Sequence, residues 1–509
     1  YIMRRIALAP LILFGSTFLV YNLAAYANDP LAELRLSSDD GARQQIIALT
    51  RDLNLDVPPP IRYFLWLKGI LGIFVGKFDL GDTRSATTVW EELSYAIPVS
   101  LRLVFVATIT ALVIGLALGI ISALRQYSRF DYAMTFLAFL LFSLPIFWVA
   151  VLLKEFMAIQ FNNFLSEPNI PIKWMAAFSI FIGIFWSSLF GGERKRFWSV
   201  FGGAFATSFV ILWAIDFTDW YLNPGLGIIL IALLSVGIAF GVTAISTGLS
   251  NVPAKKAALT MAGLAVVWYY PAQWIFNNFG SYFTIFILIS LIVLTGLGLS
   301  RIYSKIDHGP IARTAIITGI LSGFLILVDR IMQSWDDYFA TDAVNGRPVP
   351  TYGQRKDQLV TEDFWLNNLD IIMHLVLPTL ALILISLASW IRFTRGALLE
   401  VLNQDYIRTA RAKGLNEREV ITRHALRNTM LPLSSLFVGE FLGLISGAVI
   451  TERVFGWQGM GTLFIRGING GDPNLLMGVT LLFAVLTIFG NLLADLVYSA
   501  LDPRIRLGK

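Results

Sequence analysis

The feature that most constrains this chain is a series of long apolar runs with few or no charged residues. Residues 103–124, LVFVATITALVIGLALGIISAL, carry no charge and are long enough to cross a hydrocarbon core of about 30 Å as a helix. Because lipid offers no partner for backbone N–H and C=O groups, such a run crosses a membrane as a helix. The same test predicts about twelve spans, near 6–26, 99–124, 130–153, 172–190, 197–215, 226–247, 257–276, 282–299, 311–328, 371–391, 431–450 and 476–498.

Composition excludes a soluble protein. Of 509 residues, 56% are hydrophobic and 14% are charged, whereas about a quarter of a typical soluble chain is charged. The chain has no cysteine and three histidines, which removes thiolate sites and most usual ligands of metal and acid–base chemistry. We therefore predict an all-α, polytopic integral membrane protein without catalytic residues, a metal site or a cofactor of its own.

Lys and Arg residues predict the orientation, because short cytoplasmic loops collect positive charge. If the N-terminus lies in the cytoplasm, every second connection between spans is basic. In this alternation segment 392–430 and the C-terminus also fall on the cytoplasmic side. The residues that set this pattern before segment 392–430 are Arg4, Arg5, Arg125, Arg129, Arg194, Lys195, Arg196, Lys255, Lys256, Arg301, Lys305 and Arg313, and at the C-terminus Arg504, Arg506 and Lys509. We expect both termini in the cytoplasm, and we attribute the net charge of +5 to topology and not to a nucleic-acid partner.

Two long polar stretches, 27–98 and 329–370, are external in this topology. The first apolar run, between Arg5 and Ala25-Tyr26-Ala27, imitates a secretory signal peptide. At about twenty residues it exceeds the usual apolar region of roughly 7 to 15, so we expect it to be retained as the first transmembrane helix, 1–26. The sequence opens at Tyr1 instead of Met, so we expect residues to be missing before it.

The most polar and basic cytoplasmic segment is 405–432, DYIRTARAKGLNEREVITRHALRNTMLP. Its composition favours a helix, Gly414 can take the left-handed conformation that closes this helix, and Asn416 can cap a second one. A short projecting helix with small residues such as Ala410 on one face and guanidinium groups on the others is suited to dock in a groove of a soluble partner. The alternative is a solvated basic loop.

Two strings in this segment, DYIRTARAKGL and RHALRNTMLP, resemble the coupling loop of permease subunits of ATP-binding-cassette importers, and most closely that of B-type dipeptide and oligopeptide permease subunits. The general importer pattern is Glu-Ala-Ala, three residues, Gly, nine residues, then Ile, any residue, Leu-Pro. When the chain is aligned on Gly414, only Ala410, Gly414 and Leu426 fit that pattern. At the positions that do not fit the general pattern, the chain has residues that resemble those of peptide permeases. The resemblance covers roughly residues 1–160 and 365–509.

The resemblance implies a six-helix importer core with an insertion. The core consists of the first helix at 1–26, helices 2 and 3 at 99–160, and helices 4 to 6 at 371–509, with a cytoplasmic coupling loop at 400–430. The further helices at 170–330 are then inserted, and we expect them to form a peripheral scaffold or a partner-docking bundle. An even number of added helices returns the chain to the same side of the membrane, which agrees with the charge pattern.

The resemblance also implies a function and partners. The chain is expected to be a transmembrane permease subunit of an ATP-driven, binding-protein-dependent importer of di- and oligopeptides in the bacterial cell membrane. Its expected partners are a second, C-type permease subunit, one or two cytoplasmic ATPase subunits that hold ATP and Mg, and an external substrate-binding protein that docks on 27–98 and 451–472. The residues expected to couple to the ATPase are Asp405, Arg408, Thr409, Ala410, Arg411, Lys413, Gly414, Glu417 and His424.

Other functions stay open from sequence. The same machine can carry nickel chelates, glutathione or oligosaccharides, because those relatives share the loop. An ATP-independent secondary transporter fits the helix count, although the two halves lack an evident internal repeat. An ATPase or other enzyme has little support, because the string Gly72-Ile73-Phe74-Val75-Gly76-Lys77-Phe78 has the wrong spacing for a phosphate-binding loop.

Ionisable residues near or within spans are candidates for function, because burying them in a membrane is costly. Asp329 lies near the end of one predicted span, where it can reach water, and Glu440 lies deeper in another. We expect Glu440 to face the translocation path.

Overall fold

The computed structural model describes residues 2–27, 29–36, 41–190, 192–304, 308–359 and 361–501, with 2–7, 33, 444–447 and 497–501 described by their backbone alone. The secondary structure elements of this part are helices. Within that part the β pairing is a single isolated bridge between Asp82 and Thr88. The predicted all-α membrane fold is confirmed. The predictions made for Lys305, Arg504, Arg506 and Lys509 lie outside the described residues.

The chain divides into two compact units. Unit 1 comprises Tyr1–Met157, Thr351–Gln354 and His374–Lys509, and unit 2 comprises Ala158–Pro350 and Arg355–Met373. The segment predicted as an insertion, 170–330, lies within unit 2, and the predicted coupling loop, 400–430, lies within unit 1.

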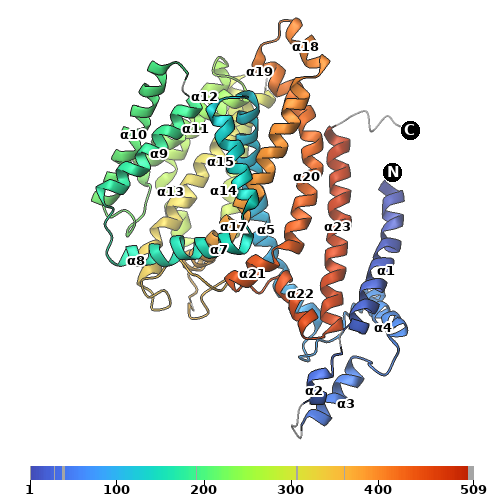
Figure 1. Cartoon of the computed structure of the whole chain (residues 1–509). Helices are drawn as coiled ribbons and strands as arrows, with labels where there is room; N and C mark the ends of the chain where they lie inside the picture. Colours follow the sequence, from blue (N-terminus) through green and yellow to red (C-terminus); the bar gives the residue numbers. More distant parts are fainter. Residues whose placement is uncertain are drawn as a thin grey trace. The chain divides into compact units, whose positions relative to one another are not determined.

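Unit 1 is built on long helices (Figure 1). Helices α5, α20 and α23 pack against one another, and α1 packs on α23. The bounds are α1 (Ile2–Ala27), α2 (Ala32–Leu36), α3 (Ala42–Asp52), α4 (Pro59–Leu71), η1 (Gly72–Val75), α5 (Val89–Leu124), α6 (Arg129–Ser143), α7 (Ile146–Leu153), α17 (Phe364–Leu402), α18 (Asp405–Ala412), α19 (Glu417–Glu419), η3 (Val420–Ala425), α20 (Leu426–Gly447), α21 (Val449–Phe455), α22 (Met460–Asn469) and α23 (Pro473–Leu501). The unit boundary crosses the π-helix η2 (Lys154–Ile159) and the first turns of α17.

Two glycines bring α5 and α17 together within unit 1. A Cβ atom added at Gly115 would lie 2.2 Å from Cβ of Trp390, and one added at Gly119 would lie 2.7 Å from Cβ of Thr394. The Gly115-xxx-Gly119 spacing places both glycines on one face of α5, where the missing side chains let the second helix approach closely. The side chain of Trp390 is fully buried.

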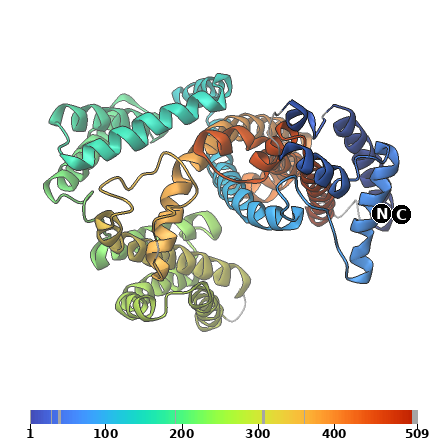
Figure 2. The same ribbon diagram turned by 90° about the horizontal axis from the view of Figure 1, so that it is seen from below.

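Unit 2 contains two groups of helices (Figure 2). Helices α9 and α10 form an antiparallel pair, and α11, α12, α14 and α15 form a bundle that α13 joins through α15. The bounds are α8 (Gln160–Ser166), α9 (Ile172–Phe190), α10 (Arg194–Phe217), α11 (Gly227–Ser246), α12 (Val252–Val267), α13 (Tyr269–Asn278), α14 (Tyr282–Tyr303), α15 (His308–Gln333) and α16 (Trp335–Ala340).

Among the described residues, nine helices are long and apolar enough to span a membrane, or ten if one bent pair is counted as a span. They are Leu8–Ala27, Val89–Leu124, Ile172–Phe190, Arg194–Phe217, Gly227–Ser246, Tyr282–Tyr303, His308–Phe339, Phe364–Leu402 and Pro473–Leu496, with Arg129–Ser143 and Ile146–Ser166 as the bent pair. The predicted count of about twelve is therefore not confirmed.

Two of the three departures have physical causes. The predicted span 130–153 bends by 101°, because Pro145 forces Leu144 into an extended conformation with ψ of 128°. The span 257–276 is divided between α12 and α13, and Pro271 in the first turn of α13 cannot continue a helical hydrogen-bond ladder. The span 431–450 overlaps α20, of which residues 444–447 are described by their backbone alone.

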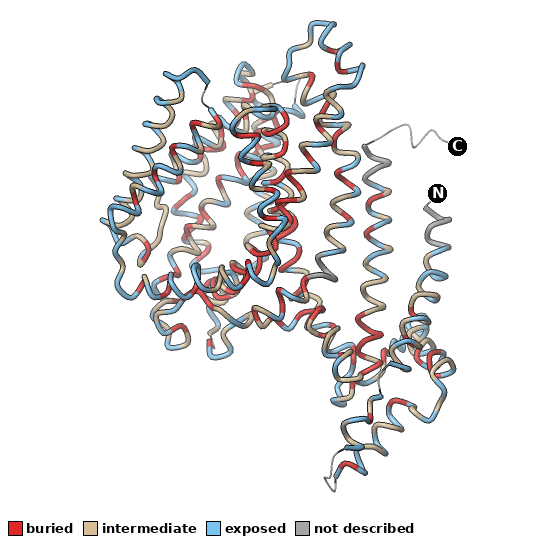
Figure 3. Tube along the Cα trace, viewed as in Figure 1, coloured by how far each residue is buried: buried red, intermediate tan, exposed pale blue. Residues whose placement is uncertain are grey.

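Burial in unit 2 differs sharply between helices (Figure 3). Helix α10 contains no buried residue, whereas α15 buries a row that includes Thr314, Thr318, Ser322 and Asp329. Helix α15 is thus the central helix of the bundle, and its row of small and polar residues allows close packing with its neighbours.

Asp329 joins three elements of unit 2. Its side chain is 1% exposed, and Oδ1 accepts hydrogen bonds from the backbone N–H groups of Leu226 (2.7 Å) and Gly227 (3.0 Å) at the start of α11. Oδ2 accepts from Tyr269 Oη (2.7 Å), Gln273 Nε2 (3.1 Å) and Gln333 Nε2 (2.9 Å). The carboxylate satisfies helix-end donors that have no intrahelical partner. Asp329 therefore has a structural role.

We predict that Asp329→Asn lowers the thermal stability of the detergent-purified protein, by about 2 kcal/mol or more, because the amide places a donor among five donors and leaves some of them unpaired. The exposed Asp336 on α16 provides the matched control, Asp336→Asn. Equal melting temperatures for the two variants would contradict the assigned role.

Candidate functional site

Segment 400–430 folds as predicted, as a helix, a glycine turn and a second helical stretch. Helix α18 ends at Ala412, Gly414 has a φ of +78°, and Asn416 caps the next helix by accepting a hydrogen bond from the backbone N–H of Glu419 at 2.8 Å. A Cβ at Gly414 would have no neighbour within 4 Å. Glycine is favoured here because of the left-handed backbone conformation and not because space is lacking.

Helix α18 is seated on unit 1 by a small apolar cluster. Ile407 and Ala410 on α18 are 0% and 5% exposed, and they pack with Ala123 at the end of α5 and Leu398 near the end of α17. Val420 and Ala425 of η3 complete the buried cluster. Ala410, which was expected on a face separate from the guanidinium groups, is turned inward together with Ile407 by the amphipathic repeat of α18.

The outward face of α18 and its turn is basic. Arg408, Thr409, Arg411 and Lys413 are exposed, as are Asp405 and Glu417, whereas His424 is half-buried within the π-helix η3. Arg411 donates to Glu417 through Nη2 (2.6 Å) and Nε (3.1 Å), which links the two sides of the Gly414 turn. These hydrogen bonds hold the pKa of Glu417 below its usual range. Arg408 pairs with Asp405 at 3.3 Å. The structure thus brings the predicted residues together in one short segment.

An ion pair lies near the apolar cluster that holds α18. Arg395 on α17 donates to both carboxylate oxygens of Asp131 on α6, at 2.6 Å and 2.9 Å, and Asp131 is 2% exposed. The same carboxylate accepts hydrogen bonds from Ser122 Oγ near the end of α5 and from the backbone N–H of Tyr127. Sequence reasoning missed this pair, because its partners are 264 positions apart and no local pattern connects them.

Glu440, the predicted path residue, lines an open groove of about 650 Å³ within unit 1. The groove lies between α17, which contributes Ser389 and Phe393, and α20, which contributes Pro432 and Leu436. Within the described part of the chain, Oε2 of Glu440 has no hydrogen-bond partner. The structure thus places Glu440 in the wall of a groove of unit 1.

At the other end of α20, Glu452 organises a second cluster. Its side chain is 0% exposed and accepts hydrogen bonds from Ser100 Oγ (2.6 Å) and from the backbone N–H of Thr462 (2.9 Å). Ser100 in turn accepts from the backbone N–H of Met460 at 2.7 Å. Burial raises the pKa of the Glu452 carboxyl, although these hydrogen bonds oppose the rise.

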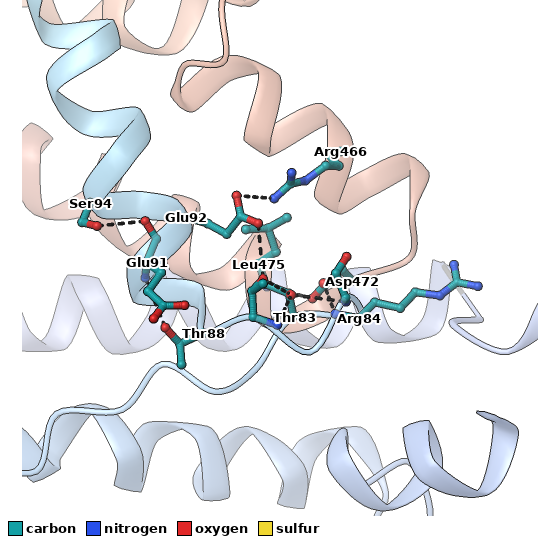
Figure 4. A network of polar contacts seen from close by, with 11 residues as sticks. Thr83, Arg84, Thr88, Glu91, Glu92, Ser94, Arg466, Asp472 and Leu475 are labelled. Atoms are coloured by element: carbon teal, nitrogen blue, oxygen red, sulfur yellow. Dashed lines mark hydrogen bonds and ion pairs between the residues drawn. The ribbon is translucent and has the colours of Figure 1, made fainter. Parts of the chain in front are cut away.

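The two segments predicted to receive the external binding protein, 27–98 and 451–472, meet in unit 1 (Figure 4). Asp472 accepts a hydrogen bond from the backbone N–H of Arg84 at 2.6 Å, and Arg84 Nη1 donates to the carbonyl of Gly470 at 2.8 Å. Arg466 pairs with Glu92 at 2.7 Å. Loop and helix residues far apart in sequence thus form one polar surface.

Comparison with known proteins finds a family whose matched range covers most of the segments described above. Residues 257–507 match the family of binding-protein-dependent transport system inner membrane components. The part of the chain at 257–507 therefore carries a domain of this family. The matched range includes the α18 segment, the Glu440 groove and Glu452, whereas Ser100 of the Glu452 cluster lies outside it. The match begins within the predicted insertion, so it does not delimit the insertion.

Three relatives illustrate the similarity. The chain is 44% identical over 138 residues to the oligopeptide transport system permease protein OppB of Mycobacterium tuberculosis, a match covering 27% of this chain and 42% of the relative. It is 39% identical over 227 residues to the oligopeptide permease protein AppB of Bacillus subtilis, covering 44% and 66%. It is 45% identical over 140 residues to the dipeptide permease protein DppB of Escherichia coli, covering 28% and 41%. The matches thus span less than two thirds of the length of each of these relatives.

We predict that Glu452 makes the stability of this membrane component depend on pH. Because burial raises its pKa, the folded protein holds the proton more strongly than the unfolded chain does. The contribution of Glu452 to the free energy of unfolding is present below the ordinary pKa of 4.5. This contribution is lost as the pH rises through the raised pKa of the folded protein. The melting temperature of the wild type minus that of Glu452→Gln should therefore increase as the pH is lowered from about 8 to about 5.

Thermal unfolding in detergent across this pH range tests the prediction, with the exposed Glu91→Gln as the control for general pH effects. A difference that shrinks toward low pH would contradict the assignment.

Proposed function

We propose that the chain is a membrane permease subunit of an ATP-driven, binding-protein-dependent importer of di- and oligopeptides, and that α18 is its contact with a cytoplasmic ATPase. The observation that carries the proposal is the construction of α18. Its apolar residues Ile407 and Ala410 are buried against the ends of α5 and α17, while Arg408, Thr409, Arg411 and Lys413 face outward. A short helix fixed on one side and polar on the other is suited to receive force from a soluble partner and pass it to spanning helices.

The remaining partners follow from the family. The proposed assembly contains a second, C-type permease subunit, one or two ATPase subunits that hold ATP and Mg, and an external substrate-binding protein. The chain itself carries out no catalysis. It lies in the bacterial cell membrane with both termini in the cytoplasm, and the polar surface around Arg84 and Asp472 faces the external binding protein.

In the proposed cycle, ATP-driven closure of the ATPase subunits displaces α18. Because α18 packs on the ends of α5 and α17, the displacement tilts these helices between outward-open and inward-open states. Glu440 lies on the path opened between this chain and the second permease. Peptide cargo is supported by the oligopeptide and dipeptide permeases to which the chain is similar, and nickel chelates, glutathione and oligosaccharides are the alternatives.

Purification of the tagged chain from its native membrane in mild detergent tests the function. We expect an ATPase chain and a second permease to copurify, and we expect peptide with the binding protein to stimulate ATP hydrolysis. Stimulation by another cargo class would replace the peptide assignment. A chain that transports without ATP would overturn the importer proposal in favour of a secondary transporter.

We predict that Gly414→Val uncouples ATP hydrolysis from peptide uptake while the chain still inserts in the membrane. Valine is strained at a φ of +78°, so the turn after α18 must shift. Reconstituted complexes should show at least about a tenfold fall in peptide transported per ATP hydrolysed.

Two further variants make this test specific. Gly414→Asn should keep most coupling, because asparagine tolerates the left-handed conformation. Gly396→Val places the same side chain at an open position of α17 and should also keep it. Full peptide uptake by Gly414→Val would refute the role of the turn.

A further inference from the structure

An apolar cavity of about 200 Å³ lies within unit 2, between α12, α13, α14 and α15. Its lining includes Met261, Phe276, Ile285 and Leu288, and the lining residues with a polar side-chain atom are Thr295 and Trp268. The Thr295 hydroxyl donates to the carbonyl of Leu291 on its own helix at 2.7 Å. The described lining therefore lacks the two to four polar partners that an ordered water needs.

Two glycines and a helix break shape the wall of the cavity. A Cβ at Gly319 would lie 2.2 Å from Cε of Met261, and one at Gly323 would lie 2.8 Å from Cδ1 of Ile292, so the glycines let these two side chains pack directly on α15. The chain breaks between α12 and α13 at Trp268, which also lines the cavity.

The shape of the cavity identifies what it can hold. Along α14 its lining extends from Ile285 to Thr295, ten residues or about 15 Å at the helical rise. A volume of 200 Å³ spread over this length is a narrow channel, although the volume itself exceeds the roughly 150 Å³ of an engineered apolar cavity that binds benzene. A flexible hydrocarbon chain fits a narrow channel better than a compact molecule does.

The lipid bilayer around these helices contains flexible hydrocarbon chains. Helices α14 and α15 are both candidate membrane spans, so the cavity lies at the depth of the hydrocarbon core. Near the end of the bundle where α13 meets α14, Trp274 and Tyr282 are 62% and 67% exposed, as is typical of residues at a membrane interface. The cavity thus extends into the bundle from the level at which lipid headgroups end.

We propose that this cavity is a binding site for one acyl chain of a membrane lipid. The lipid fills the gap that α12, α13, α14 and α15 leave between them, and it stabilises unit 2 as a packed side chain would. The site is independent of the transport function proposed above, and it gives the helices of unit 2 a lipid-binding role.

Photocrosslinking tests the site in the intact protein. The detergent-purified complex is reconstituted with a phospholipid that carries a diazirine near the end of one acyl chain, irradiated and digested. We expect the label on residues 285–295 and 319–327 at about one lipid per chain. A label spread evenly over exposed apolar faces such as that of α10 would overturn the proposal.

A cavity-filling variant tests occupancy. Ala265 lines the cavity and is half-buried, so Ala265→Phe should reduce labelling of these residues about tenfold by occupying the space of the chain. Ala206→Phe, on the exposed face of α10, is the matched control and should label like the wild type. Unchanged labelling in a folded Ala265→Phe protein would refute the site, and if that variant fails to fold, the labelling pattern of the wild type decides.

Discussion

The close contact between α5 and α17 is the interaction on which the candidate site depends. In a membrane, helices gain little from hydrophobic burial against each other, so association relies on close packing and on satisfied polar pairs. Unit 1 uses both. Gly115 and Gly119 admit the backbone and side chains of α17, and the Asp131–Arg395 ion pair fastens the same helix to α6 nearer the ends. Helix α18 is then seated on the ends of the two helices that are joined.

The packing around α18 is what the proposed coupling depends on. The apolar cluster around Ile407 links α18 to α5 and α17, and η3 continues directly into α20. The Glu452 cluster lies at the far end of α20, where it ties α21 to Ser100 on α5. In the proposed cycle, a displacement of α18 would be passed to α5, α17 and α20 as a rigid-body movement.

Much of this could be predicted from the sequence, because the signals are local. Apolar length predicted most of the spans, and Gly414 and Asn416 predicted the turn and the cap around α18. The sequence did not indicate that Ala410 packs inward with Ile407, because that orientation depends on the contacts of α18 with α5 and α17. The bend at Pro145 was a local signal that was overlooked, and so was the Gly115-xxx-Gly119 spacing.

Other features could not be predicted from one sequence. Asp131 with Arg395, and Ser100 with Glu452, are pairs of distant residues that only the folded chain brings together. Asp329 could be recognised as a costly ionisable residue, but not as the cap of α11, because its five donors come from three separate segments. The cavity beside α14 likewise depends on how four helices meet.

The most direct test of the central claim is site-directed crosslinking from α18 to the ATPase subunit. The chain has no cysteine, so single cysteines introduced by Thr409→Cys and Ala410→Cys can be compared without background. The account predicts that the exposed position 409 is crosslinked to the ATPase in the assembled complex and that the buried position 410 is not. Crosslinking from position 410 alone, or crosslinking from neither position in a complex that retains its ATPase, would contradict it.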